Sequence, residues 1–436
     1  MIRTTLSRFH AQTTPRGRGM FVLLAVVLLI ALATGEVVLY HLSYFLMVAI
    51  ALCYAWAWLN LRRLDMRVED QDLVAQVGGF LNGSITVHNR SRLRTGWVEI
   101  AQISDMPGHV CEGATQLPAR GWEQWKTEVL CYARGVYTVG PLVARSSDPL
   151  GLFRVKITRT TPVTVIIYPR VAELPGFRLP EADLSGERSA LLHLRAHSAQ
   201  ASTARQYTHG DSLSRIHWPS TARCGQLMSK EFDSGKSNDV WIILDLQRVV
   251  HKTAGMDRSD EYAVAIAASL ASRALSEDCS VGLIAYGDRE YLLPPHGGTP
   301  QMSRVLETLA LSRTEGETPL DEVLVKDAQK LGRLASLFVV TSSTDTAWVS
   351  ELRDLMSRGL SIATVLIDPM SFGGEQSCHD AGMRLISAGI LTYTIRRGDD
   401  ISSALSWPMT PADVSEFGPS SEVSLADIPD HSEVRV

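Results

Sequence analysis

The longest apolar runs of the chain lie near its N-terminus, at residues 20–33 and 37–59, with Thr34-Gly35-Glu36 between them. The second run is long enough to cross a bilayer, which takes about 20 apolar residues in a helix. The first run is shorter, but Arg18 can extend its side chain to the headgroups and the helix can continue into the turn that follows. The pattern therefore predicts a transmembrane helical hairpin over residues 20–62.

Arginines lie on both flanks of this pair of runs: Arg3, Arg8, Arg16 and Arg18 in the basic N-terminus (residues 1–19), and Arg62, Arg63 and Arg67 after the hairpin. A secretory signal peptide is the alternative, because residues 31–33 form an Ala-x-Ala pattern. Its cleavage, however, would leave a chain that enters the second apolar run almost at once. Because basic flanks remain in the cytoplasm, we expect a two-pass protein of the inner or plasma membrane, surrounded by membrane lipid, with its soluble domains cytoplasmic.

Residues 63–170 alternate between apolar and polar positions over short stretches, which Gly, Pro and Asp turns separate. A period of two is typical of half-buried strands. Several short strands without a long helix favour a β-sandwich-like domain, and a small barrel is the alternative. Residues 148–153 are expected to turn and bring apolar side chains to the end of this domain. The expected strands are residues 84–88, 97–103, 126–132, 137–144 and 163–168.

Residues 239–405 alternate between apolar strands and helical segments. Residues 239–246 are almost continuously apolar, as in strands that are buried on both faces of a parallel sheet, and the alanine-rich residues 260–275 have helical spacing. Such alternation favours right-handed crossovers and a doubly wound sheet. Further strands are expected at 280–286, 290–293, 335–341, 361–367 and 390–395, and helices at 300–311, 349–357 and 379–388. The expected fold class is α+β multidomain: a transmembrane helical hairpin, a β-sandwich-like domain, and an α/β doubly wound domain.

The composition agrees with two soluble domains and an anchor: 436 residues, 45% of them apolar, with a net charge of −5. This balance gives no indication of a nucleic-acid partner. The six cysteines form no C-x-x-C pair and no metal-ligand spacing, as expected in a reducing compartment, and a Cys111–Cys131 disulfide would need the opposite topology. Residues 171–238 are expected to connect the two domains, and residues 406–436, rich in Ser, Pro, Asp and Glu, to form a disordered acidic tail.

The most unusual segment, residues 205–233, mixes polar, aromatic and basic side chains without helix or strand periodicity. It is either a long connection pinned by internal ion pairs or a surface with a specific task. Its motif comprises Arg205, Tyr207, Gly210-Asp211, Arg215, His217-Trp218, Thr221-Ala222-Arg223 and Lys230-Glu231, and a second motif lies at residues 134–141 and 147–153. Together they resemble the bacterial and archaeal domain-of-unknown-function 58 family. That family has no established reaction, so the resemblance implies architecture more than chemistry.

The α/β region resembles a von Willebrand factor type A domain, which the family resemblance also implies. In metal-binding members, an Asp-x-Ser-x-Ser turn after the first strand, a later Thr and an Asp after the fourth strand hold Mg²⁺. Here Asp245 has the first position and Thr299 is a remnant of the threonine, but Gln247 and Val249 replace the serines and residues 342–344 contain no Asp. We therefore expect no cofactor, with Asp245 capping or hydrogen bonding at a degenerate site. Mg²⁺ at Asp245 and Thr299 is the alternative.

The leading hypothesis is a membrane-anchored cytoplasmic scaffold or adaptor that acts in the assembly or maturation of envelope or other complexes. The family resemblance implies a MoxR-type AAA+ ATPase as its protein partner. The chain lacks the common phosphate, dinucleotide and zinc motifs. The alternatives are a hydrolase-type enzyme that uses His217 and Cys224, and a purely structural coupling of the two domains. The candidate residues for protein interaction are Arg205, Tyr207, Asp211, Arg215, His217, Trp218 and Arg223.

Overall fold

The computed structural model describes residues 8–69, 71–159, 162–177, 203–206, 218–231, 239–254, 257–332 and 335–410. The chain divides into two compact units, Met1–Arg170 and Val171–Val436. Residues 184–195 of the connection, where the sequence allows a helix, lie outside the described residues, as does the tail beyond residue 410.

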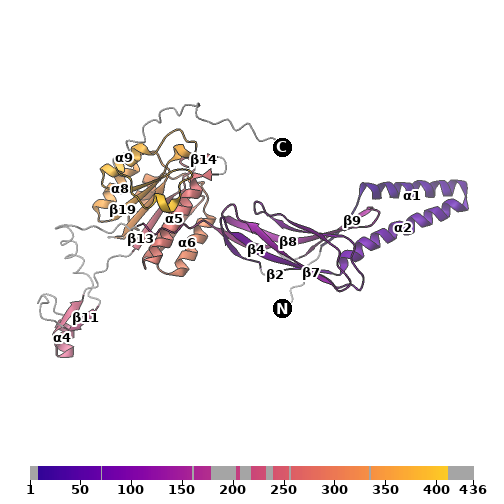
Figure 1. Cartoon of the computed structure of the whole chain (residues 1–436), viewed down its shortest axis with the longest axis horizontal. Helices are drawn as coiled ribbons and strands as arrows, with labels where there is room; N and C mark the ends of the chain where they lie inside the picture. Colours follow the sequence, from indigo (N-terminus) through magenta and orange to yellow (C-terminus); the bar gives the residue numbers. More distant parts are fainter. Residues whose placement is uncertain are drawn as a thin grey trace, which may run out of the picture. The chain divides into compact units, whose positions relative to one another are not determined.

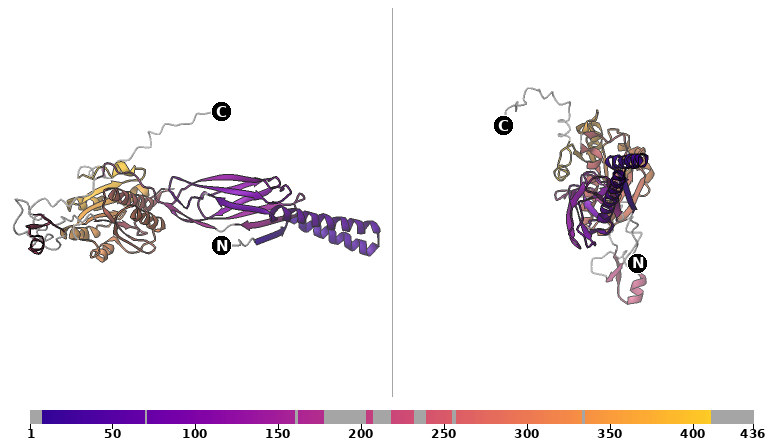
Figure 2. Two further views of the ribbon diagram at one scale, coloured as in Figure 1. Left: turned by 90° about the horizontal axis from the view of Figure 1, so that it is seen from below. Right: turned by 90° about the vertical axis from the view of Figure 1, so that its right-hand side faces the viewer.

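Two long helices form a hairpin at the start of the first unit: α1 (Pro15–Thr34) and α2 (Val37–Arg62). Gly35 ends α1 in the left-handed region at φ 74°, a conformation that glycine adopts without strain. By length and composition both helices could cross a membrane. Most of their large apolar side chains face outward, and Figures 1 and 2 show the pair projecting beyond the strands of its unit. The predicted hairpin is present, and this weakly indicates membrane association.

The strands of the first unit form two sheets (Figure 1). The larger has seven strands, in the order β1-β9-β8-β10-β3, with β5 paired to β8 and β6 paired to β5. The smaller has the order β2-β4-β7. The first sheet contains β1 (Arg8–Thr13), β3 (Val74–Gln76), β5 (Val98–Ser104), β6 (Cys111–Thr115), β8 (Gly135–Ser147), β9 (Phe153–Arg159) and β10 (Val163–Tyr168), and the second contains β2 (Leu64–Glu69), β4 (Phe80–Asn89) and β7 (Trp122–Leu130).

Both sheets contribute to one core, as expected for a sandwich. Ile85 and Val87 of β4 lie in the same buried cluster as Leu142 of β8 and Ile157 of β9. The apolar positions in the alternation predicted for residues 84–88 thus form the inward face of the small sheet. The sequence pattern missed β9, in which charged residues alternate with apolar ones.

The last turns of α2 enter this same core. Ala57 and Leu61 are fully buried among the sandwich residues. The side chain of Asn60 donates to Ser146 Oγ at 3.2 Å and accepts from the backbone N–H of Gly96 at 3.1 Å. The helix therefore belongs to the unit's folded core at one end and exposes apolar side chains at the other.

The predicted turn at residues 148–153 joins the hairpin to the sandwich. The Asp148 carboxylate accepts from the N–H groups of Leu150 and Phe153, which fixes the turn. Phe153 packs edge-on against Phe21 of α1 and Tyr54 of α2, and Leu152 is buried beside it. The apolar residues of this motif thus have a structural role at the base of the hairpin.

The second unit is built on a six-stranded sheet in the order β17-β16-β13-β18-β19-β20. All neighbours are parallel except β16 and β17. The strands are β13 (Asp239–Asp245), β16 (Ser280–Tyr286), β17 (Glu290–His296), β18 (Ser336–Thr341), β19 (Ser361–Ile367) and β20 (Leu391–Ile395), which follow the sequence prediction closely. Their apolar character reflects burial on both faces, because Ile242 packs into one cluster and Ile243 into the other.

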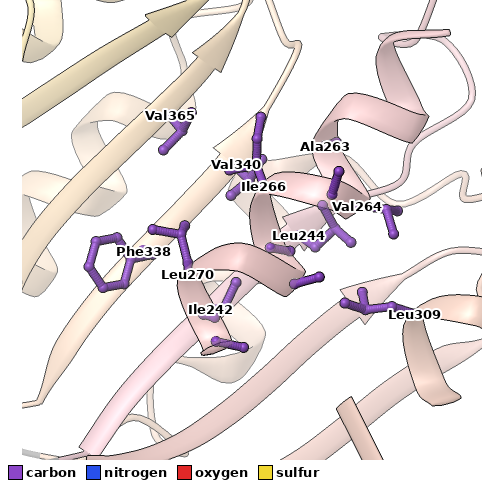
Figure 3. Packing of buried hydrophobic residues seen from close by; sticks show 14 of the residues in the cluster. Ile242, Leu244, Ala263, Val264, Ile266, Leu270, Leu309, Phe338, Val340 and Val365 are labelled. Carbon is purple, nitrogen blue, oxygen red and sulfur yellow. The ribbon is translucent and has the colours of Figure 1, made fainter. Parts of the chain in front are cut away.

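Helices cover both faces of this sheet. On one face α5 (Ser259–Ser276) and α6 (Thr299–Leu311) pack over Ile242 and Leu244 (Figure 3). On the other, α7 (Leu320–Asp327), α8 (Trp348–Ser357) and α9 (His379–Ser387) pack over Trp241 and Ile243. Full burial of one such side chain contributes about 1.5–3 kcal/mol. The unit is therefore a doubly wound α/β domain, and of these five helices α7 is the one that the sequence pattern did not predict.

Smaller elements complete the second unit. The strands β11 (Thr203–Gln206) and β12 (Met228–Glu231) pair antiparallel and flank α4 (Trp218–Cys224). The others are β14 (Thr253–Ala254), β15 (Asp257–Arg258), the 3₁₀ helix η2 (Pro369–Phe372) and α10 (Ile401–Ala404).

Candidate functional site

The sheet of the second unit has a switch point between β13 and β18. The chain passes from β13 to β16 on one side, and β18 and β19 lie on the other. In doubly wound sheets the loops at the carboxyl ends of such strands separate, and ligands bind in the space between them. The residues at this position are Asp245, which ends β13, and Thr341, which ends β18.

The side chains of Asp245 and Thr341 form a hydrogen bond across the switch point. The Thr341 hydroxyl donates to Asp245 Oδ2 at 2.6 Å, and the backbone N–H of Gln247 donates to Oδ1 at 3.0 Å. Both residues are buried. Burial raises the pKa of Asp245, although these hydrogen bonds oppose the rise. Each carboxylate oxygen therefore already has a donor from this chain.

His251 ties the loop after β13 back to the sheet. Its Nε2 lies 2.8 Å from the backbone oxygen of Asp245 and its Nδ1 3.1 Å from Ser259 Oγ. A carbonyl oxygen can only accept, so Nε2 carries the proton. The Ser259 hydroxyl oxygen also accepts from the backbone N–H of Lys252 at 2.9 Å. These contacts hold the loop after β13 against the start of α5.

A second buried carboxylate, Asp260, begins α5 next to this loop. Arg258 donates to it from Nε at 2.9 Å and from Nη2 at 2.6 Å, and the Thr314 hydroxyl donates at 2.6 Å. Burial raises the pKa of Asp260, but the hydrogen bonds from Arg258 and Thr314 outweigh burial and hold the pKa at about 2. Asp260 is therefore ionised at neutral pH, at a helix N-terminus that favours negative charge.

The loop that carries Thr314 packs closely against the site because it contains Gly316. Gly316 exchanges backbone hydrogen bonds with Leu246 and Arg248, at 3.1 and 3.0 Å. A Cβ at Gly316 would lie 2.3 Å from the backbone oxygen of Tyr286, so no other residue fits without a shift of the backbone. The close approach brings Thr314 within reach of Asp260.

The two weak candidates for metal ligands, Asp245 and Thr299, lie far apart, at opposite ends of the sheet. Thr299 begins α6, three residues after His296, which pairs with Val281 near the amino end of β16. Asp245 pairs with Tyr286 at the carboxyl end of the same strand. Thr299 thus lies at the opposite end of the sheet, whereas Thr314 lies on the loop whose Gly316 bonds to Leu246 and Arg248. The pattern missed Thr314 because nothing in its sequence reveals which loop folds back to β13.

The carboxylates at the switch point already accept hydrogen bonds from groups of this chain. Among the described residues there is no group of three or more His, Cys, Asp or Glu that could hold a metal ion. The oxygens of Asp245 accept from Thr341 and Gln247, and Asp345, which follows β18, accepts from the N–H groups of Thr346 and Ala347 at the start of α8. These carboxylates therefore stabilise the loops that follow β13 and β18.

The signature segment is described in part. Arg205 lies in β11, opposite Ser229 of β12. Trp218 and Arg223 belong to α4, and both are exposed, Trp218 to 65%. Cys224 is also exposed. The candidates Tyr207, Asp211, Arg215 and His217 lie outside the described residues.

Comparison with known proteins bears on this second unit. Residues 203–377 match the family described as "Protein of unknown function DUF58". The match starts in β11, includes α4 and the switch point, and supports the resemblance drawn from the signature motif. DUF58 carries no stated activity, and the motif at residues 134–153 lies outside the matched range.

A relative supports DUF58 in the same way. The chain is 26% identical over 212 residues to the uncharacterized protein YeaD of Bacillus subtilis (strain 168), which covers 48% of this chain and 50% of the relative. The chain thus aligns with about half the length of that relative.

The similar solved structures are too distant to bear on the function of this chain. A β-glucosidase from Listeria innocua is 9% identical, with a TM-score of 0.17, over 24% of this chain and 16% of the enzyme. The CARDB domain of a Pyrococcus furiosus protein is 12% identical, with a TM-score of 0.18, over 24% of this chain and 88% of that domain. Likeness this low says nothing about the activity of the chain.

Proposed function

We propose that this protein is a membrane-anchored adaptor that binds a protein partner through its second unit. α1 and α2 act as the anchor, and the basic flanks keep both soluble units on the cytoplasmic side. The anchor is supported by the exposed apolar faces of two helices whose other ends are packed into a folded domain.

The second unit is proposed to be a von Willebrand factor A-like domain with a degenerate metal site. In support, Asp245 ends the first strand of the sheet in chain order and Thr341 ends the fourth, next to the loops on which metal-binding members carry ligands. Here the two side chains bond to each other. The loops at the switch point are thereby fixed without an ion.

The observation that carries the adaptor proposal is the exposure of Trp218. It is 65% exposed at the start of α4, and Arg223 on the same short helix is exposed as well. Exposed Trp and Arg are the residue types that most often dominate binding at protein interfaces. We propose a MoxR-type AAA+ ATPase as the partner, in assembly or maturation of envelope or other complexes.

Binding of purified ATPase to the full chain in lipid nanodiscs tests this proposal. Trp218→Ala should raise the Kd roughly tenfold or more, as expected for a central interface aromatic. The matched control is Trp407→Ala, because Trp407 is 82% exposed in the same unit but lies outside the DUF58 match. With folding of both variants verified by circular dichroism, equal affinities of wild type and Trp218→Ala would contradict docking through α4.

A further inference from the structure

The loop between β4 and β5 combines basic and apolar side chains on its exposed surface. Arg92 and Arg94 are exposed, Leu93 is 66% exposed and Trp97 is 65% exposed. Large apolar side chains next to exposed cations suit the boundary between a bilayer and water, where tryptophan is enriched and arginine meets phosphate.

Hydrogen bonds fix this loop against the end of α2. The N–H of Arg90 donates to the backbone oxygen of Arg63 at 2.9 Å, and the N–H of Gly96 donates to Asn60 Oδ1 at 3.1 Å. Ser146 Oγ donates to the backbone oxygen of Trp97 at 3.0 Å. The loop therefore has a defined height along the helix, level with Asn60.

The length of α2 places that height at the lipid headgroups. From Val37 to Trp56 the helix is about 30 Å long at a rise of ~1.5 Å per residue, which equals the hydrocarbon thickness of a bilayer. Trp56 is 48% exposed, and the Arg62 guanidinium stacks 4.4 Å above the Trp58 ring. Asn60 is one turn beyond Trp56, so the loop beside it lies just outside the hydrocarbon. This step rests on the membrane anchor of the proposed function.

The arginines of this surface have no carboxylate partner within the described residues. Arg62, Arg63, Arg92 and Arg94 form no ion pair there, and Arg94 donates only to the neutral Gln116, at 3.2 Å. The nearby acid, Asp65, is already paired with Arg67 and Arg90. Four positive charges are thus left for an anion, and the planar guanidinium group suits phosphate oxygens.

We propose that Arg62, Arg63, Arg92, Leu93, Arg94 and Trp97 form a binding surface for anionic phospholipid headgroups. The guanidinium groups bind the lipid phosphates at the end of α2, while Leu93 and Trp97 enter the boundary of the acyl chains. The surface holds the β-sandwich against the membrane and selects anionic over zwitterionic lipid.

Quenching of tryptophan emission by brominated lipids tests this surface in the full chain. The protein is reconstituted into vesicles that contain either brominated phosphatidylglycerol or brominated phosphatidylcholine. We expect phosphatidylglycerol to be preferred severalfold in wild type, since one arginine near an anionic surface enriches that lipid roughly fivefold. The triple variant Arg62→Gln/Arg92→Gln/Arg94→Gln keeps Arg63 and should lower the preference to the level that this one arginine supports.

The control is Arg304→Gln/Arg353→Gln/Arg358→Gln, which removes the same charge from exposed positions of the second unit and should keep the preference. Equal preference in wild type and the Arg62 triple variant would overturn the lipid-binding surface, while quenching by either lipid would still show that the helices enter the bilayer. If neither lipid quenches the wild type, the anchor of the proposed function fails together with this inference.

Discussion

At the scale of single residues, the bond between Asp245 and Thr341 holds the two loops of the switch point together. Thr341→Val removes the donor to a buried carboxylate and should lower the free energy of unfolding by about 1–3 kcal/mol. Thr364→Val is the matched control, because the Thr364 hydroxyl is buried in the neighbouring strand β19 and has no partner among the described residues. Loss of this hydroxyl in Thr364→Val should leave the free energy of unfolding unchanged or raise it.

Thermal and urea unfolding of the full chain in detergent micelles compares the two variants. Similar losses at Thr341 and Thr364 would contradict the idea that the hydroxyl of Thr341, rather than threonine packing in general, stabilises the site.

The pKa of Asp260 gives a dependence of stability on pH. Hydrogen bonds from Arg258 and Thr314 lower this pKa from its ordinary value of 3.8 to about 2, against the effect of burial. A lowered pKa contributes stability above the unfolded value, which is lost as the pH falls toward the folded value. The ionised Asp260 carboxylate contributes about 1–2 kcal/mol to the free energy of unfolding. This value allows for solvent screening, because Arg258 is half exposed.

Asp260→Asn should therefore be less stable than wild type at pH 6, and this difference should shrink as the pH falls from about 4 to about 2. Urea unfolding at a series of pH values measures it. A difference that stays constant over this range would show that the charge of Asp260 is not the cause.

At the scale of elements, the contact between α1 and the turn at residues 148–153 depends on Gly17. A Cβ there would lie 2.3 Å from the backbone oxygen of Leu152, whereas a Cβ at Gly19, in the same helix, would meet nothing within 4 Å. Gly17→Ala should lower thermal stability and loosen the base of the hairpin. Gly19→Ala should be neutral or stabilising by up to about 1 kcal/mol, because alanine favours helices.

Limited proteolysis of the two variants in detergent micelles reads out the base of the hairpin. Faster cleavage at Arg16 or Arg18 is expected only for Gly17→Ala. Matching cleavage rates in both variants would mean that the close approach to Leu152 has no part in holding α1.

The sequence was most informative where an element is buried on both sides. The predicted strands 280–286 and 361–367 match β16 and β19, because continuous apolar runs leave few other solutions. β2 and β9 were missed because charged residues interrupt their apolar positions, and α7 because eight residues carry too little periodicity.

The candidate site was predictable only in part. Asp245 directly follows an apolar strand, which marks it from sequence alone. Its contacts with Thr341 and the neighbouring pair of Asp260 and Thr314 join residues 54 or more positions apart. Such pairs depend on how the loops fold back, so the pattern selected Thr299 where the structure brings Thr314.

At the scale of the whole molecule, α2 belongs to two environments. Its C-terminal turns are buried in the sandwich core, through Ala57 and Leu61, while its N-terminal turns expose apolar side chains. The proposed anchor is continuous with a folded domain and would hold that domain at the membrane surface. There the proposed adaptor would meet its cytoplasmic partner.

The most direct test of this account is the topology of the hairpin. Alkaline phosphatase is active only outside the cytoplasm and green fluorescent protein fluoresces inside it, so each is fused after Gly35 and after Arg63 in a bacterial host. We expect active phosphatase after Gly35, and fluorescence without phosphatase activity after Arg63. Active phosphatase after Arg63 would place the soluble units outside the cytoplasm and contradict the adaptor.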